Sequence, residues 1–192
     1  DEALVNRILK KVFSKFASQD IESKHINMVR AFALEAENGT VISLPFKIKC
    51  IKEYDYLTIG YIKKKDMSGN YPFRSGKLRI DGYGVIRTTS SKVRTEPKSH
   101  QHIVDAGRIP TTAVWRFRKE GDVFAPLGLG GSKKLKDYFI DKKIPNRMRQ
   151  EIPVLADGNK ILVVADIEIA DEVKVTDDTH QFFKINYEKE LF

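Results

Sequence analysis

The sequence predicts an α+β protein with a helical and β substrate-recognition module over residues 1–100 and a small β-rich domain with one or two helices over residues 101–192. Three observations favour this fold class. Apolar residues recur at helical spacing through the first 37 residues, and the spacing becomes alternating after Asn38-Gly39. Asp157-Gly158 separates two apolar runs, as in a β-hairpin. With 41% hydrophobic residues, the 192-residue chain can form a packed core.

Two helices are expected in the first module. A helix over residues 2–18 would bury an apolar stripe, and a second over residues 24–37 would begin at a capping Ser23 and end at Asn38-Gly39. The residues expected to face inward are Leu4, Val5, Ile8, Leu9, Val12, Phe13 and Phe16 in the first helix, and Ile26, Val29, Phe32 and Ala33 in the second. Strands are predicted at residues 41–42, 48–51 and 56–62, around a turn at Pro45.

Short strands and turns are expected in the rest of the chain. The polar stretch 90–101 is predicted to be a mobile loop or linker, and the domain boundary is placed there. Ser132 is expected to cap a helix over residues 133–140, and Pro145 to open a helical turn that Pro153 closes. The strands are predicted at residues 78–80, 85–89, 103–105, 114–118, 154–156 and 161–164, with an edge strand at 182–187.

Positive charge is concentrated in the middle of the chain. The formal net charge is +8, but residues 63–149 carry +13, whereas residues 150–192 carry −6. A field of one sign over one surface attracts a polyanion, so the pattern favours a nucleic-acid partner. Arg116 and Arg118 are expected to share the outward face of a strand, with Trp115 and Phe117 in the core. No aromatic side chains alternate with the cations, which favours recognition of a duplex by its backbone and shape.

Several kinds of site are excluded. The run Gly128–Lys134 resembles a phosphate loop, but its Ser precedes Lys-Lys and it lacks the Walker order. What remains is a Gly-rich turn before a helix start, which fits either a phosphate site or an ordinary capped helix with solvated lysines. His100 and His102 have no cysteine or carboxylate cluster beside them and are read as exposed loop histidines rather than metal ligands. No nucleophile lies at a suitable spacing from a base. We therefore predict no catalytic residue and no metal in this chain.

Cys50 is the only cysteine, which excludes an intrachain disulfide and suits a reducing compartment. No apolar run is long enough to span a bilayer, and no signal peptide is visible. A cytoplasmic protein without a membrane partner is expected. The chain begins with Asp1 rather than Met, so we expect a piece of a longer protein.

Ordered positions over about 40 residues resemble the C-terminal domain of tRNA(Ile)-lysidine synthetases. The pattern is Arg-x-Arg, Gly121-Asp122, Pro126, Gly128, Ser132-Lys133-Lys134-Leu135-Lys136, Phe139 and Ile144-Pro145, with Arg149 and Pro153 at fixed spacing. Upstream, Asn6-Arg7, His25-Ile26, Leu44-Pro45, Glu53-Tyr54-Asp55 and Val104-Asp105-Ala106 look like further parts of the same family. The family's catalytic motif, Ser-Gly-Gly-x-Asp-Ser, does not occur in the sequence.

The resemblance implies a part of an enzyme that attaches lysine to the anticodon wobble cytidine of an isoleucine tRNA. Its catalytic PP-loop domain, with ATP and Mg, would lie outside this chain. The expected partners are tRNA, held at its body and acceptor stem, and that catalytic domain, with a homodimer left open. The expected tRNA-binding residues are Arg116, Arg118, Lys133, Lys134, Lys136, Lys142, Lys143, Arg147 and Arg149.

Three points stay open at this stage. Arg149 lies between Pro145 and Pro153 and fits either a phosphate contact or a buried arginine that holds the connection together. Asp166 and Glu168 depart from the family pattern and would repel phosphate, so the acidic segment is expected to face away from RNA or to pack on a neighbouring domain. The alternative function is a basic protein–protein or ribosome-associated adaptor without a catalytic role.

Overall fold

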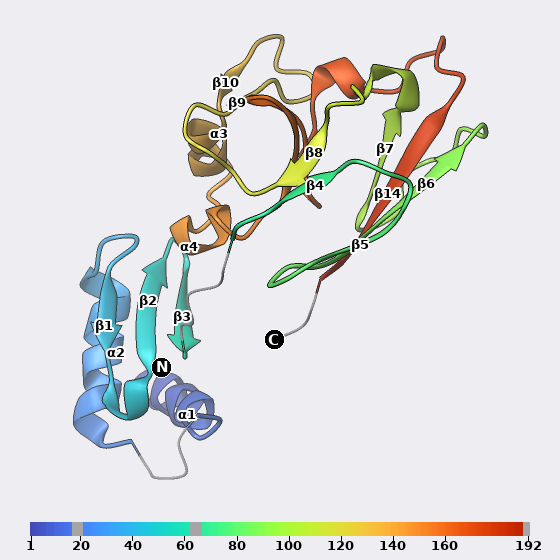
Figure 1. Cartoon of the computed structure of the whole chain (residues 1–192). Coiled ribbons are helices and arrows are strands. Elements are labelled where there is room, and N and C mark those ends of the chain that lie inside the picture. The colour runs from blue at the N-terminus through green and yellow to red at the C-terminus, as the bar shows by residue number, and fades with distance from the viewer. Residues whose placement is uncertain (17–20, 62–66, 190–192) are drawn as a thin grey trace. The chain divides into compact units, whose positions relative to one another are not determined.

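The computed structural model describes residues 1–16, 21–61 and 67–189, and Figure 1 traces the order of their helices and strands. The chain divides into two compact units, Asp1–Lys64 and Lys65–Phe192. Both units combine helices with antiparallel strands, as the predicted α+β class requires. No helix of the described ranges is both long and apolar enough to cross a bilayer.

The first unit packs two helices against a three-stranded antiparallel sheet. The helices are α1 (Glu2–Phe13) and α2 (Ser23–Glu35), and the strands, in sheet order, are β1 (Val41–Ser43), β2 (Lys49–Glu53) and β3 (Tyr56–Gly60). Between β1 and β2 the predicted turn at Pro45 is a 3-10 helix, η1 (Pro45–Lys47). Residues 17–18 and 62, which the sequence assigned to a helix and a strand, lie outside the described residues.

The two helices use their apolar faces differently. In α2 the predicted inward residues Ile26, Val29 and Phe32 are buried, so the helical period identified that face correctly. Ser23 is the first residue of α2 and not its cap, because Glu22 occupies the N-cap position. In α1 only Leu9 and Phe13 are buried, while Leu4, Val5 and Ile8 stay 41–53% exposed. The apolar stripe of α1 is wider than the surface that this unit offers to cover it.

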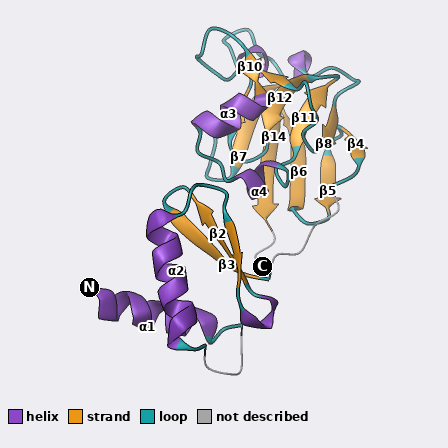
Figure 2. Cartoon of the chain, turned by 90° about the vertical axis from the view of Figure 1, so that its left-hand side faces the viewer, coloured by secondary structure: helices purple, strands orange, loops and turns teal. Residues whose placement is uncertain are grey.

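The second unit contains two sheets that share one hydrophobic core (Figure 2). The smaller sheet has four antiparallel strands, in the order β5 (Gly76–Ile80), β6 (Gly84–Ser91), β14 (Phe182–Lys189) and β7 (Gln101–Asp105). The larger has the order β10 (Lys133–Lys134), β9 (Val123–Phe124), β12 (Lys160–Val164), β11 (Val154–Asp157), β8 (Val114–Arg116) and β4 (Asn70–Pro72), with β13 (Glu168–Ile169) paired to β12. The helical pieces are η2 (Ala106–Arg108), α3 (Leu135–Asp141), α4 (Asn146–Arg149) and η3 (Asp171–Val173).

Two expectations about this unit change. The predicted linker 90–101 connects β6 to β7, and both strands pair with β14, so a boundary near residue 100 would cut through one sheet. The structure divides the chain at residue 64 instead. The last strand was predicted to lie at an edge, but β14 is an inner strand with a neighbour on each side. The predicted Asp157-Gly158 hairpin is confirmed, because β11 and β12 pair across it.

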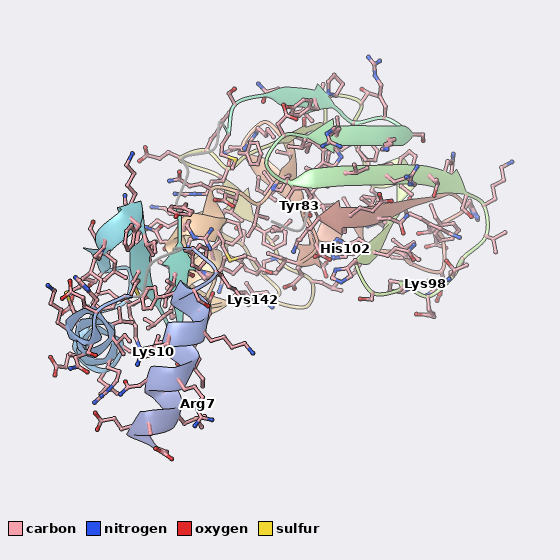
Figure 3. The ribbon with its side chains drawn as sticks, turned by 90° about the horizontal axis from the view of Figure 1, so that it is seen from below. Arg7, Lys10, Tyr83, Lys98, His102 and Lys142 are labelled. Carbon is pink, nitrogen blue, oxygen red and sulfur yellow. The ribbon has the colours of Figure 1, made fainter. Side chains whose placement is uncertain are left out.

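His102 lies on β7 and not in an exposed loop. Its Nδ1 atom is 3.0 Å from the hydroxyl oxygen of Tyr187 on β14, and Figure 3 labels His102 and Tyr83 beside these strands. Burial lowers the pKa of His102, and this effect outweighs the opposite influence of the nearby carboxylates of Asp166 and Glu168.

The stability of the chain should therefore fall as the pH drops below about 6.5, the ordinary histidine pKa. In that range the unfolded chain binds a proton at residue 102 more readily than the folded one does, so protonation favours unfolding. Urea denaturation at pH 7.5, 6.5 and 5.5 measures the free energy of unfolding. This free energy should fall more steeply with decreasing pH in the parent than in His102→Gln. Equal slopes for the two proteins would show that His102 is not responsible.

Candidate nucleic-acid interface

Arg116, at the end of β8, and Asp122 form a buried ion pair. Their side chains are 3% and 2% exposed, and the two guanidinium nitrogens Nη1 and Nη2 donate to the two carboxylate oxygens at 2.9 and 2.7 Å. Nη1 also donates to the carbonyl of Phe117 and Nη2 to the carbonyl of Gly158. The expectation that Arg116 contacts phosphate at the surface is therefore corrected, since the guanidinium is enclosed and both its Nη1 and Nη2 groups donate within the fold.

The predicted core positions on either side of Arg116 are confirmed, with Trp115 2% and Phe117 6% exposed. The alternation of β8 thus placed the aromatic side chains correctly. It did not show that the opposite face of β8 is also enclosed. β8 lies between β11 and β4 in the sheet, and the turn at Gly158 reaches the guanidinium of Arg116.

The same pair positions two neighbouring segments. Asp122 Oδ2 accepts a hydrogen bond of 2.7 Å from the backbone N–H of Lys119, which closes the turn that follows β8. The carbonyl of Asp122 accepts from the N–H of Leu135, the first residue of α3, at 2.9 Å. The turn after β8 and the start of α3 are therefore held beside each other by one residue.

Between these segments lies a hollow of about 870 Å³. Four cationic residues line it: Arg118 and Lys119 from the turn, Lys134 from the end of β10, and Lys136 from the first turn of α3. We call this surface the basic hollow. The other residues lining it are Met67, Phe117, Glu120, Gly121, Asp122, Asp137 and Gln150.

Arg118 lines the hollow and has one unsatisfied donor. Its Nε atom is buried and has no hydrogen-bond partner in the part of the chain that the structure describes. A buried donor left without an acceptor costs about 1–3 kcal/mol. The residue as a whole is half-buried and lines the basic hollow, and a guanidinium is well shaped to bind a phosphate.

The predicted phosphate site at a helix start is not formed as expected. Lys133 and Lys134 pair with β9 as the short strand β10, and α3 begins only at Leu135. Ser132 is therefore not the cap, and Lys134 takes that position without a side-chain hydrogen bond. Leu135, Tyr138 and Phe139 are buried as predicted, whereas Ile140 is 43% exposed.

Three of the predicted cations are engaged with carboxylates. Lys133 Nζ lies 2.8 Å from Asp141 Oδ2. Lys142 Nζ lies 2.9 Å from Glu168 Oε2 and also above the ring of Tyr138; Figure 3 labels this lysine. Arg147 is half-buried, and its Nη1 atom lies 3.9 Å from Glu151 Oε1. A phosphate would have to compete with these pairs.

Two further predicted residues have roles in the local fold. Arg149 is 9% exposed and its Nε donates to the carbonyl of Ile144 at 2.7 Å, so it holds the connection between α3 and α4. This is the structural alternative that the two flanking prolines had suggested. Lys143 adopts φ +52° where α3 ends, and the backbone bonds from Lys143 to Ile140 and from Ile144 to Phe139 close the helix. Its side chain is exposed.

Lys119 is the residue that the sequence analysis missed. It follows the Arg-x-Arg pattern directly, at the point where the alternation of β8 ends and before the Gly121-Asp122 turn. A charged residue between the end of a strand and a turn is not needed in the core. Its position in the sequence could therefore have indicated that the side chain of Lys119 is exposed and available for a ligand. Among the described residues no group of three or more His, Cys, Asp or Glu side chains could hold a metal ion.

Fold and surface define the second unit as a β-rich α+β domain with a cation-lined hollow. Residues 113–186 match the family model described as "TilS substrate C-terminal domain". This range includes the buried ion pair and the four cations of the basic hollow.

Relatives match along nearly the whole chain. A tRNA(Ile)-lysidine synthase of Clostridioides difficile (strain 630) is 39% identical over 188 residues, which cover 88% of this chain and 38% of the relative. The tRNA(Ile)-lysidine synthase of Caldanaerobacter subterraneus subsp. tengcongensis is 31% identical over 199 residues, which cover 98% of this chain and 42% of the relative. The chain thus spans less than half the length of either relative. A crystal structure of a TilS C-terminal domain, 23% identical, superposes with a TM-score of 0.55 and covers 65% of this chain and 98% of that one.

The chain therefore carries a TilS substrate C-terminal domain, and over most of its length it is a relative of the C-terminal domain region of tRNA(Ile)-lysidine synthases. The resemblance inferred from the sequence is confirmed. The solved structure supports the fold of the domain.

Removing one partner of the buried pair should be costly. Asp122→Ala leaves the Arg116 guanidinium enclosed without its counter-charge, and we expect a decrease of about 3–5 kcal/mol in the free energy of unfolding. Urea denaturation measures it. Asp141→Ala is the matched control, because it removes the exposed pair with Lys133 and should cost no more than about 1 kcal/mol. Similar decreases in both variants would contradict the central role of the Arg116–Asp122 pair.

Proposed function

We propose that this chain binds tRNA as part of a tRNA(Ile)-lysidine-forming ligase, and that the basic hollow contacts the RNA backbone. The observation that carries the proposal is that the four cations of the hollow all lie inside the range that matches the TilS substrate domain. The proposed contacts are Arg118, Lys134 and Lys136, which the sequence predicted, and Lys119.

The side chains at this surface suit phosphate better than bases. Phe117 is the only aromatic residue lining the hollow among those described, and it is buried, so it offers no exposed ring for a base to stack on. Duplex RNA hides its base edges in a deep, narrow major groove and presents phosphates and 2′-hydroxyls. Ammonium and guanidinium groups recognise those phosphates without reading the sequence. The hollow therefore fits a structured region of tRNA.

The chemistry of the proposed ligase would belong to a part of the protein outside this chain. A PP-loop domain binding ATP and Mg would activate the wobble cytidine for attack by lysine, while this chain holds the tRNA. The sequence contains no Ser-Gly-Gly-x-Asp-Ser motif to which that step could be assigned. None of the related proteins named above supports the adaptor alternative.

Removing two charges from the hollow should weaken tRNA binding. Lys134→Gln combined with Lys136→Gln removes both ammonium groups while keeping side chains of similar reach. For each phosphate that is no longer neutralised, the slope of the logarithm of the binding constant against the logarithm of the salt concentration should become shallower by about 1. Mobility-shift titrations with folded tRNA at several salt concentrations measure both effects. The matched control is Lys92→Gln with Lys98→Gln, two exposed lysines that do not line the hollow. If the two double variants bind equally well, the hollow is not the tRNA site.

A further inference from the structure

The four-stranded sheet of the second unit carries a polar row across its outer face. Lys77 on β5 lies opposite Arg87 on β6, Arg87 opposite Asn186 on β14, and Asn186 opposite Gln101 on β7. Directly opposed residues point to the same side of a sheet, and neighbouring strands lie about 4.8 Å apart. One ammonium, one guanidinium and two amides thus form a row about 14 Å long, or three such spacings.

Two more cations lie on the same face. Arg79 is two residues beyond Lys77 on β5, and Lys184 is two residues before Asn186 on β14, so both share the side of the row. Lys77, Arg79 and Arg87 are exposed, and Lys184 is half-buried. The neighbouring positions Leu78, Ile86 and Ile185 point to the opposite side, where they pack in or against the core. We call the side with the four cations the outer sheet face.

The need to protect an edge strand explains only part of this pattern. Lysine and arginine on edge strands discourage pairing with other chains, and β5 is an edge strand, so Lys77 and Arg79 could serve that purpose. Arg87 and Lys184 lie on β6 and β14, which have a neighbour on each side. Water on the outer side of a sheet favours polar residues at such positions, but it does not by itself select cations over carboxylates or neutral side chains.

Among the described residues of the four strands, this face carries four cations and two carboxylates, Glu188 and Asp105. Glu188 Oε1 lies 3.3 Å from Arg87 Nη2. Both side chains are about half exposed, and exposed pairs contribute little, so a phosphate could replace Glu188 as the partner of Arg87. Asp105, at the far end of β7, is occupied by hydrogen bonds from Thr179 and from the backbone of Gly107.

The chemistry of the face selects among anionic partners. On the same side Phe182 and Ile103 are buried, so the four strands present no exposed aromatic ring on which an unpaired base could stack. The amides of Gln101 and Asn186 are already joined by a 2.7 Å hydrogen bond, and their remaining donors and acceptors suit ribose hydroxyls as well as phosphate oxygens. This combination fits the backbone of folded RNA better than a single strand.

We propose that the outer sheet face is a second contact for the RNA backbone, built from different elements than the basic hollow. The inference rests on the proposed function, because the same tRNA would be the ligand. Two separate contacts would restrict the orientation of a folded RNA more than one contact does.

The test compares three double variants of equal charge in the 192-residue chain. Lys77→Gln with Lys184→Gln alters the outer sheet face, Lys134→Gln with Lys136→Gln alters the hollow, and Lys92→Gln with Lys98→Gln is the control. Glutamine keeps much of the lysine stem, so thermal melts should stay close to that of the parent. We expect the outer-face variant to bind folded tRNA about tenfold more weakly than the control, with a salt dependence shallower by about 1–2.

The outcomes separate this inference from the proposed function. If the outer-face variant binds like the control while the hollow variant is impaired, the second contact does not exist and the proposed function stands. If the parent chain binds no tRNA, both fail. Competition adds a further criterion, because an unstructured RNA of equal length should displace tRNA from the parent less well than folded tRNA does. Equal displacement by the two RNAs would overturn the assignment to folded RNA. The assignment would also fail if the outer-face variant lost affinity for polyglutamate, another polyanion, by the same factor as for tRNA.

Discussion

The ion pair between Arg116 and Asp122 is the interaction on which the second unit depends. Two charges taken out of water are tolerated only when their hydrogen-bonding groups are satisfied, and here the guanidinium meets both carboxylate oxygens and two carbonyls. Asp122 also accepts from Lys119 and, through its backbone carbonyl, from Leu135. One pair thereby joins the end of β8, the following turn, the β11–β12 turn and the start of α3. The basic hollow exists because this buried pair fixes its two rims.

Charge along the chain and charge in space are different quantities in this protein. The sequence separates a basic middle from an acidic final segment, which suggested opposite surfaces. In the fold the two segments interleave, because β11 and β12 pair with strands of the basic stretch and β14 lies between β6 and β7. Carboxylates of the final segment consequently meet basic partners: Asp166 contacts His100 and Lys189, Glu168 contacts Lys142, and Glu188 contacts Arg87. The cations that remain at the hollow and on the outer sheet face are a smaller and more specific set than the composition implied.

Among the described residues, neither cationic surface offers an exposed aromatic ring, and this shared property constrains the kind of recognition. Contacts to phosphates position a nucleic acid without reading its sequence, and shape then decides which molecules fit. In such an arrangement specificity would come from the spacing and rigidity of the contacts. Both surfaces are built on sheet strands or on turns tied to them by buried hydrogen bonds, so the positions of the cations are set by the core.

The sequence by itself determined the local elements and the family. The helical period found the buried face of α2, alternation placed Trp115 and Phe117 in the core, Asp157-Gly158 predicted its hairpin, and the ordered pattern from Arg116 to Pro153 identified the TilS domain. These features depend on residues close together in the chain, where periodicity and turn chemistry act. Only the tertiary structure decided that Arg116 is enclosed by Asp122, that Lys133 and Lys134 join a strand, that Lys119 lines the hollow, and that β14 is an inner strand. Each of these depends on pairing between segments distant in sequence, and a charged side chain looks the same along the chain whether it meets water or a buried carboxylate.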